Sequence, residues 1–146
     1  MRLRQPTIAI AAAAVVCLLP ACKDGAAEEE AGGGEVATVE PVEGGDVPAI
    51  TLTQEAADRI DVRTEQVGSV GKGTLTIPYA AVLYDPAGDT WTYTSPEALV
   101  YVRAPVEVER IVGDRAFLSE GPPPGTDVVV VGAAELLGTE YEVGEE

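Results

Sequence analysis

The stretch Ile77–Tyr93 constrains the fold of this chain most strongly, because it predicts a strand, a tight turn and a returning strand. The apolar first arm ends at Tyr84, and a turn follows in which a proline fixes φ and a glycine permits a positive φ. The returning arm alternates, so that Trp91 and Tyr93 share one face. The only Trp and three of the five Tyr lie in this stretch. Large aromatic side chains bury the most area per residue, so we expect this hairpin to be the centre of a small β core.

The chain beyond residue 50 has mostly strand-like patterns. Thr53 is placed to cap a helix of about two turns whose small and apolar residues face inward. The run Asp127–Val131 is almost continuously β-branched, which predicts a strand buried on both faces. Further strands are predicted at residues 50–52, 62–67, 99–104, 106–112 and 115–119, with a flexible joint at 68–73, a rigid proline loop at 121–125 and one helical turn at 132–137.

The first 21 residues have the pattern of a targeting segment. Two arginines precede the apolar run Ile8–Leu19, which is shorter than the roughly 20 residues of a membrane span and suits a signal peptide. The run ends at Leu18–Cys22, which resembles the lipobox of bacterial lipoproteins, although Pro20 stands where that motif has a small residue. The resemblance implies that Cys22 is diacylated and becomes the new N-terminus. A plain secretory signal with an incidental cysteine is the alternative.

Cleavage before Cys22 would remove Cys17 with the signal peptide, and the lipid would consume the Cys22 thiol. The mature protein would then have no disulfide and no free thiol. Two acyl chains give stable anchoring, so we expect the protein on the outer face of the cytoplasmic membrane or in the periplasm. Residues 22–49 are rich in Gly, Ala and Glu, and we expect them to be a disordered acidic linker.

The predicted fold class is therefore mainly β: a small antiparallel β-roll or barrel with one or two short helices, preceded by a signal peptide and a disordered linker. We expect a signal peptide at 1–21, the lipid-anchored linker at 22–49, a β domain at 50–138 and an acidic tail at 139–146. One domain with tails suits a chain of 146 residues with one Phe and one Trp.

Composition also argues against several kinds of chemistry. The net charge of −16 argues against binding to nucleic acid or to anionic lipid. With no His and a single cysteine left after processing, zinc and copper sites are not expected, and the turn at Asp85–Asp89 does not have the full spacing of a calcium loop. No catalytic or nucleotide-binding motif occurs in the sequence. We therefore expect no enzymatic activity, no metal and no cofactor.

Five aromatic residues are the candidates for a partner or ligand surface. At strand spacing such residues are commonly core, but they could instead line a groove that binds a small hydrophobic ligand. A ligand-binding or sensing lipoprotein is thus one functional hypothesis. The five residues are Tyr79, Tyr84, Trp91, Tyr93 and Tyr101.

A family resemblance gives another hypothesis. The segments 50–67, 77–82, 106–118 and 121–136, in this order and spacing, resemble the membrane-proximal domain of the periplasmic adaptor subunits of RND-type efflux pumps, the HlyD-like membrane fusion proteins. The prolines at 122–124 and Thr126 depart from the family pattern of the last segment.

The resemblance implies a stand-alone membrane-proximal domain assembled from both ends of the chain. In the family, a β-barrel domain, a lipoyl domain and a helical hairpin lie between these ends, and here Gly68–Gly73 stands in their place. The implied function is that of a lipid-anchored accessory protein of a membrane transporter, with an RND or ABC transporter component as its partner.

Overall fold

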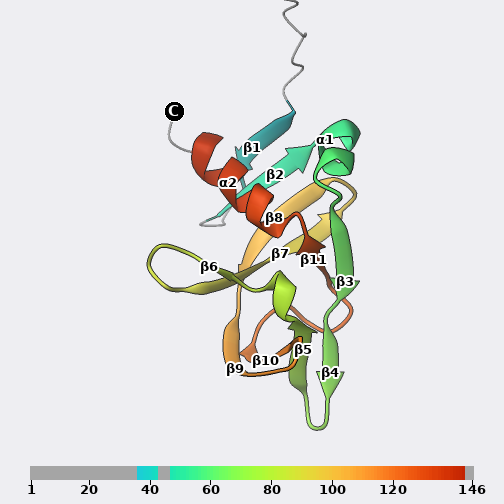
Figure 1. Cartoon of the computed structure of the whole chain (residues 1–146), viewed down its shortest axis with the longest axis vertical. Helices are drawn as coiled ribbons and strands as arrows, with labels where there is room; N and C mark the ends of the chain where they lie inside the picture. The colour runs from blue at the N-terminus through green and yellow to red at the C-terminus, as the bar shows by residue number, and fades with distance from the viewer. Residues whose placement is uncertain (1–35, 43–46, 144–146) are drawn as a thin grey trace, which may run out of the picture. The chain divides into compact units, whose positions relative to one another are not determined.

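A computed structural model describes residues 36–42 and 47–143 of the chain (Figure 1). The predicted signal peptide, Cys22 and most of the predicted linker lie outside these residues. The described part contains eleven strands, two α-helices and one 3-10 helix. The prediction of a mainly β fold with short helices is therefore confirmed.

The strands form two antiparallel sheets. The larger sheet has the order β1-β2-β8-β7-β11-β3, with β6 paired to β7, and the smaller has the order β4-β5-β10-β9. Among the described residues the sheets do not close into a barrel, because the first ends at β1 and β3 and the second at β4 and β9. The bounds are β1 Ala37–Pro41, β2 Pro48–Leu52, β3 Arg63–Gln66, β4 Gly68–Val70, β5 Thr74–Pro78, β6 Leu83–Tyr84, β7 Thr90–Glu97, β8 Val100–Pro105, β9 Glu107–Val112, β10 Arg115–Glu120 and β11 Asp127–Val131.

The predicted central hairpin is divided between the two sheets, so that prediction was wrong in its first arm. β5 ends at Pro78 in the smaller sheet, and the 3-10 helix η1 (Tyr79–Ala81) then leads to the short strand β6 beside β7. Pro78 has no N–H to extend a ladder, and its fixed φ suits the start of a turn. The turn is closed by a hydrogen bond from the Val82 N–H to the Tyr79 carbonyl at 3.0 Å.

The predicted flexible joint at 68–73 is a β-hairpin. β4 pairs with β5 through the turn Gly71–Gly73, in which Gly71 and Gly73 have φ values of +59° and +101° that favour glycine. At Gly68, a Cβ would lie 2.8 Å from the Thr76 Oγ1, so this position also requires glycine. The glycines that suggested mobility are needed for a tight connection.

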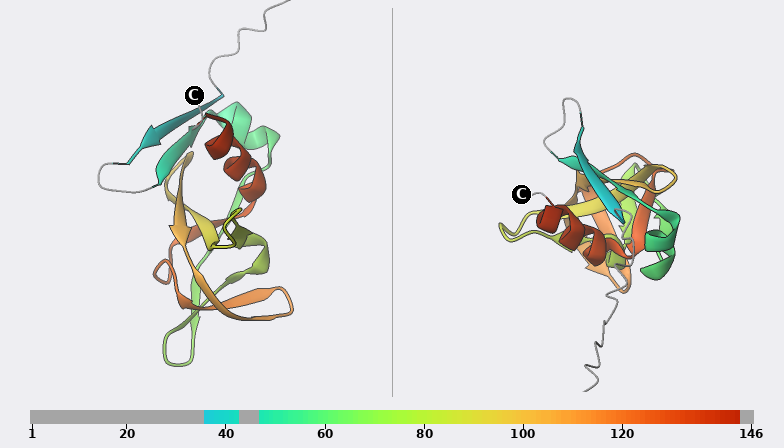
Figure 2. Two further views of the ribbon diagram at one scale, coloured as in Figure 1. Left: turned by 90° about the vertical axis from the view of Figure 1, so that its left-hand side faces the viewer. Right: turned by 90° about the horizontal axis from the view of Figure 1, so that it is seen from above.

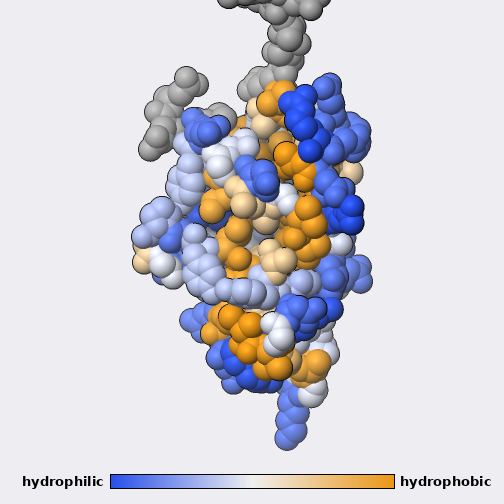
Figure 3. Space-filling model, in the orientation of Figure 1, coloured by the Kyte–Doolittle hydropathy of each residue, from blue (hydrophilic) through white to orange (hydrophobic). Residues whose placement is uncertain are grey.

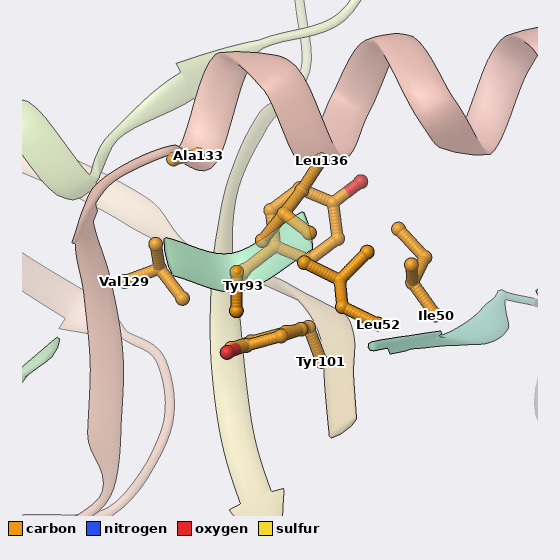
Figure 4. Close-up of a cluster of buried hydrophobic side chains, with 8 residues drawn as sticks. Ile50, Leu52, Tyr93, Tyr101, Val129, Ala133 and Leu136 are labelled. Carbon is orange, nitrogen blue, oxygen red and sulfur yellow. The ribbon is translucent and has the colours of Figure 1, made fainter. Parts of the chain in front are cut away.

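Two hydrophobic cores share strand β11. The first core contains Tyr93, Val129 and Leu136, and Figure 4 shows these side chains beneath helix α2 (Ala133–Val143). The second core contains Val128 and Leu118. Val128 and Val129 are both 0% exposed, which confirms the prediction that this strand is buried on both faces.

The folded part extends further in both directions than the sequence predicted. β1, in the expected linker, pairs with β2, and its Val39 packs against the first core. α2 continues through residues 139–143, which were expected to be an acidic tail. Figure 2 shows α2 beside β1 and β2, in agreement with their contacts. β1 is ordered because Val39 packs on the first core, and the end of α2 is ordered because Glu140 pairs with Arg103 and Tyr93.

Three local predictions are confirmed. The Thr53 Oγ1 accepts a hydrogen bond from the Ala56 N–H at 3.2 Å and caps helix α1 (Gln54–Arg59). β9 and β10 form the expected hairpin around Gly113–Asp114. β3 pairs with β11, so segments from the two ends of the domain lie side by side.

Candidate functional site

A buried polar network holds α2 on the larger sheet. The Tyr93 hydroxyl donates to the Glu140 carboxylate at 2.5 Å, and the Arg103 guanidinium lies 2.8 Å from the other carboxylate oxygen. The side chains of Arg103 and Glu140 are only 11% and 6% exposed. Burial, together with the bond to Glu140, raises the pKa of Tyr93 well above its usual range. We call Tyr93, Arg103 and Glu140 the α2 network; its geometry fixes the position of a helix.

Trp91 packs against the Arg103 guanidinium of the α2 network. The Arg103 guanidinium carbon lies 4.4 Å from the centre of the Trp91 ring and 6.0 Å from that of Tyr141. A guanidinium at these distances is attracted by the ring face. The only tryptophan of the chain is thus engaged in structural packing.

The five predicted aromatic residues do not form one groove. Tyr93 and Tyr101 lie in the first core at 0% and 4% exposure. Trp91 is half-buried against Arg103. Tyr79 and Tyr84 are exposed, and a hydrogen bond with Tyr79 raises the pKa of Tyr84. Tyr84, Trp91, Tyr93 and Tyr101 all lie in the larger sheet, and Tyr79 lies in η1. The five do not share one surface because two of them are buried in the core and two are exposed.

A concave surface lies instead where the chain crosses between the sheets. One hollow of about 710 Å³ is lined by the crossover Ala104–Glu107, by Glu120–Pro123, and by Thr94 and Thr126. An adjoining hollow of about 360 Å³ is lined by Gly88–Trp91 and again by Pro105–Glu107. We call the two hollows together the junction groove. Of the five predicted aromatic residues only Trp91 lines the junction groove. No local sequence pattern indicates the groove, because its walls come from segments far apart in the chain.

The walls of the junction groove are fixed by backbone bonds and prolines. The Val106 N–H donates to the Thr90 carbonyl at 3.0 Å, and the Thr90 hydroxyl donates back to the Val106 carbonyl at 2.5 Å. On the opposite wall, the Val67 N–H donates to the Thr126 carbonyl at 2.8 Å. Prolines at 105, 122 and 123 restrict the backbone further. The groove is therefore preformed.

The Asp85 carboxylate fixes the loop at the end of the junction groove. It accepts hydrogen bonds from the Asp89 N–H at 2.9 Å and from the Trp91 indole N–H at 3.1 Å. Desolvation acts to raise the pKa of Asp85, but these bonds outweigh it and lower the pKa below its ordinary value. The carboxylate therefore stays ionised and keeps Asp89 in place on the groove wall.

The junction groove is acidic at its rim and largely apolar along its floor. Glu107 and Glu120 face each other in register on β9 and β10, and Asp89 lines the smaller hollow. No Lys or Arg is among the residues that line either hollow. Within the described part of the chain, no three His, Cys, Asp or Glu residues are grouped to hold a metal ion. The groove is suited to receiving a cationic group with an apolar stem.

Comparison with known proteins adds no assignment: no family model, no curated protein and no solved structure matches the chain. None of the helices in residues 36–42 and 47–143 has the length and hydropathy needed to cross a membrane. The predicted lipidation site, Cys22, lies outside the described residues.

Proposed function

We propose that this protein is a lipid-anchored, non-catalytic accessory protein that acts outside the cytoplasmic membrane and docks on a membrane transporter or its neighbour. The observation that carries the proposal is the pairing of β3 with β11. In the membrane-proximal domain of efflux adaptors, which the sequence resembles, the two ends of the chain likewise build one domain. The lipobox-like segment before Cys22 supports attachment to the membrane.

The connection between the two halves supports docking rather than channel building. In the adaptor family the halves are separated by three further domains, whereas here β4 and β5 are joined directly by a turn of three residues, Gly71–Gly73. A domain joined in this way retains only the surface that, in the family, faces the transporter. The alternative of a small-ligand sensor is less favoured, because its aromatic residues are divided between core and surface.

Replacing Cys22 by serine is expected to release the protein from the membrane fraction, because the serine hydroxyl does not accept the lipid. The polypeptide without acyl chains then has no membrane anchor. Fractionation followed by immunoblotting measures this directly. Cys17→Ser is the matched control and should remain membrane-bound. A Cys22→Ser protein that still sediments with membranes would contradict lipid anchoring.

The proposed partner is tested by crosslinking in native membranes and identifying what co-purifies with the wild-type protein. We expect a component of an RND or ABC transporter to be recovered, and its recovery to fall when Cys22→Ser removes the protein from the membrane. Recovery of no transporter component with crosslinkers of several lengths would count against the proposal.

A further inference from the structure

We infer that the junction groove docks an extended, basic segment of a partner protein. The inference rests on the proposed function for the identity of that partner, and it adds the chemistry of the contact. It is drawn from the form of the groove, from its charge and from the sequence of the chain's own ends.

The form of the junction groove suits a polypeptide better than a small molecule. The two hollows adjoin at Pro105–Glu107, so the concave surface continues from the loop at Gly121–Pro123 to the loop at Gly88–Asp89. Many of its lining residues are exposed, including Pro105, Glu107 and Pro123. A small ligand is usually held by burying most of its surface, which a shallow groove does not do. A segment attached to a larger partner gains affinity from contacts elsewhere.

The charge of the groove specifies a basic occupant. Glu107 and Glu120 are directly opposite on neighbouring strands, an arrangement that is destabilising for like charges unless a cation lies between or beside them. Asp89 adds a third carboxylate in the smaller hollow. The carboxylates line a surface that includes the exposed prolines Pro105 and Pro123, against which the methylene stem of a lysine or arginine can pack.

Arginines on the neighbouring strands do not supply this positive charge. Arg103 is paired with Glu140, Arg115 with Glu65 at 2.6 Å, and Arg110 with Glu109 while its guanidinium lies 4.1 Å from the Phe117 ring centre. The Glu107 carboxylate accepts a hydrogen bond from the Ser119 hydroxyl at 3.0 Å, but a hydroxyl leaves its negative charge uncompensated. The charge of the groove therefore remains available to an external cation.

The acidic segments of the chain outside the described residues do not match the groove, and the basic Arg2 and Arg4 belong to the predicted signal peptide. Residues 28–30 are three consecutive glutamates, and residues 145–146 are two more. Such segments would add like charge beside Glu107 and Glu120. The net charge of −16 would also steer a basic partner toward the protein and repel a second copy. The complementary occupant is therefore a different, basic polypeptide.

The test measures binding of a fluorescent peptide that alternates lysine with valine to the full chain, by anisotropy at physiological ionic strength. Glu107→Gln combined with Glu120→Gln should weaken binding about tenfold, since two charge pairs are lost. Glu97→Gln combined with Glu135→Gln changes the net charge equally at exposed sites outside the groove, and should weaken binding less than about twofold. Equal effects of the two pairs would overturn the inference, because they would indicate attraction to the net charge alone.

Two further arms separate the other outcomes. Thr126→Tyr, which places a bulky ring in the larger hollow without changing charge, should also weaken peptide binding about tenfold, with circular dichroism verifying the fold. Unchanged binding in a folded Thr126→Tyr protein would overturn the inference. Saturable binding of benzyltrimethylammonium without binding of the peptide would also overturn it, in favour of a small organic cation.

Failure of this inference is distinguishable from failure of the proposed function. Peptide binding is measured on the purified protein, whereas transporter association is measured by crosslinking in membranes. A wild-type protein that captures a transporter component but does not bind the peptide refutes only the docking groove.

Discussion

Replacing Glu140 by alanine is expected to lower the free energy of unfolding by about 3–5 kcal/mol, because it leaves the Arg103 guanidinium buried without a counter-charge. Arg103 is 11% exposed, and its Nε already has no hydrogen-bond partner among the described residues. The substitution also leaves the buried Tyr93 hydroxyl without its acceptor. Urea denaturation of the wild type and the variant measures the difference.

Two further variants separate the ion pair from the helix itself. Glu142→Ala, on the same helix but exposed, should change the free energy of unfolding by less than about 0.5 kcal/mol. Arg103→Met combined with Glu140→Leu should recover much of the stability lost in Glu140→Ala, because an apolar pair of similar volume needs no charge compensation. A loss below about 1 kcal/mol in Glu140→Ala would mean that α2 is held by its apolar contacts alone.

The burial of the Arg103–Glu140 ion pair decides how much it is expected to contribute to the free energy of unfolding. The pairs Arg59–Glu55 and Arg63–Asp61 have side chains that are 63–84% exposed, and such pairs contribute about 0–1 kcal/mol. The pair formed by Arg103 and Glu140 is desolvated, so its disruption leaves a charge that water does not reach. The same residue types thus have different consequences at the surface and under α2.

Val128→Ala and Val129→Ala are each expected to lower the free energy of unfolding by about 2–3 kcal/mol, through lost apolar burial and the cavity that remains. Both side chains are 0% exposed, but Val128 belongs to the second core and Val129 to the first. Because β11 joins the two cores, both substitutions should shift one common unfolding transition. Val131→Ala, at a position that is 39% exposed, is the control and should have a much smaller effect.

Trp91 provides the probe for this common transition. It lies against Arg103 above the first core, so its fluorescence reports on that part of the molecule. If Val128→Ala shifts the Trp91 transition as much as Val129→Ala does, the cores unfold together. A Trp91 transition that is insensitive to Val128→Ala would show that the two sheets unfold independently.

Part of the exposed hydrophobic surface outside the junction groove lies on the smaller sheet. Ile111 and Val112 on β9 are 43% and 58% exposed, and Val70 on β4 is 45% exposed. Figure 3 shows apolar surface over this sheet, at the lower end of the view. Neither complementary charge nor a neighbouring segment specifies what would cover these residues, so no function is assigned to them.

Local patterns in the sequence were sufficient where a structure depends on neighbours along the chain. Thr53 caps α1 because the donor it satisfies is three residues away. The β9–β10 hairpin follows from a two-residue turn between strand-like runs. The continuous valines of β11 predicted burial on both faces, since a strand exposed on one face would alternate with polar residues.

The tertiary structure decided what depends on distant partners. Glu140 lies in a segment whose acidic composition predicted a tail. Its burial is favourable only because β8 and β7 place Arg103 and Tyr93 beneath α2. β1 has too few residues to be stable alone and becomes a strand by pairing with β2. The division of Ile77–Tyr93 between two sheets and the junction groove likewise arise from contacts between segments far apart in the chain. The sequence by itself thus determined the mainly β character, the cap of α1, the β9–β10 hairpin and the burial of β11. The strand β1, the length of α2, the strand order, the buried charge and the concave surface required the whole chain to assemble.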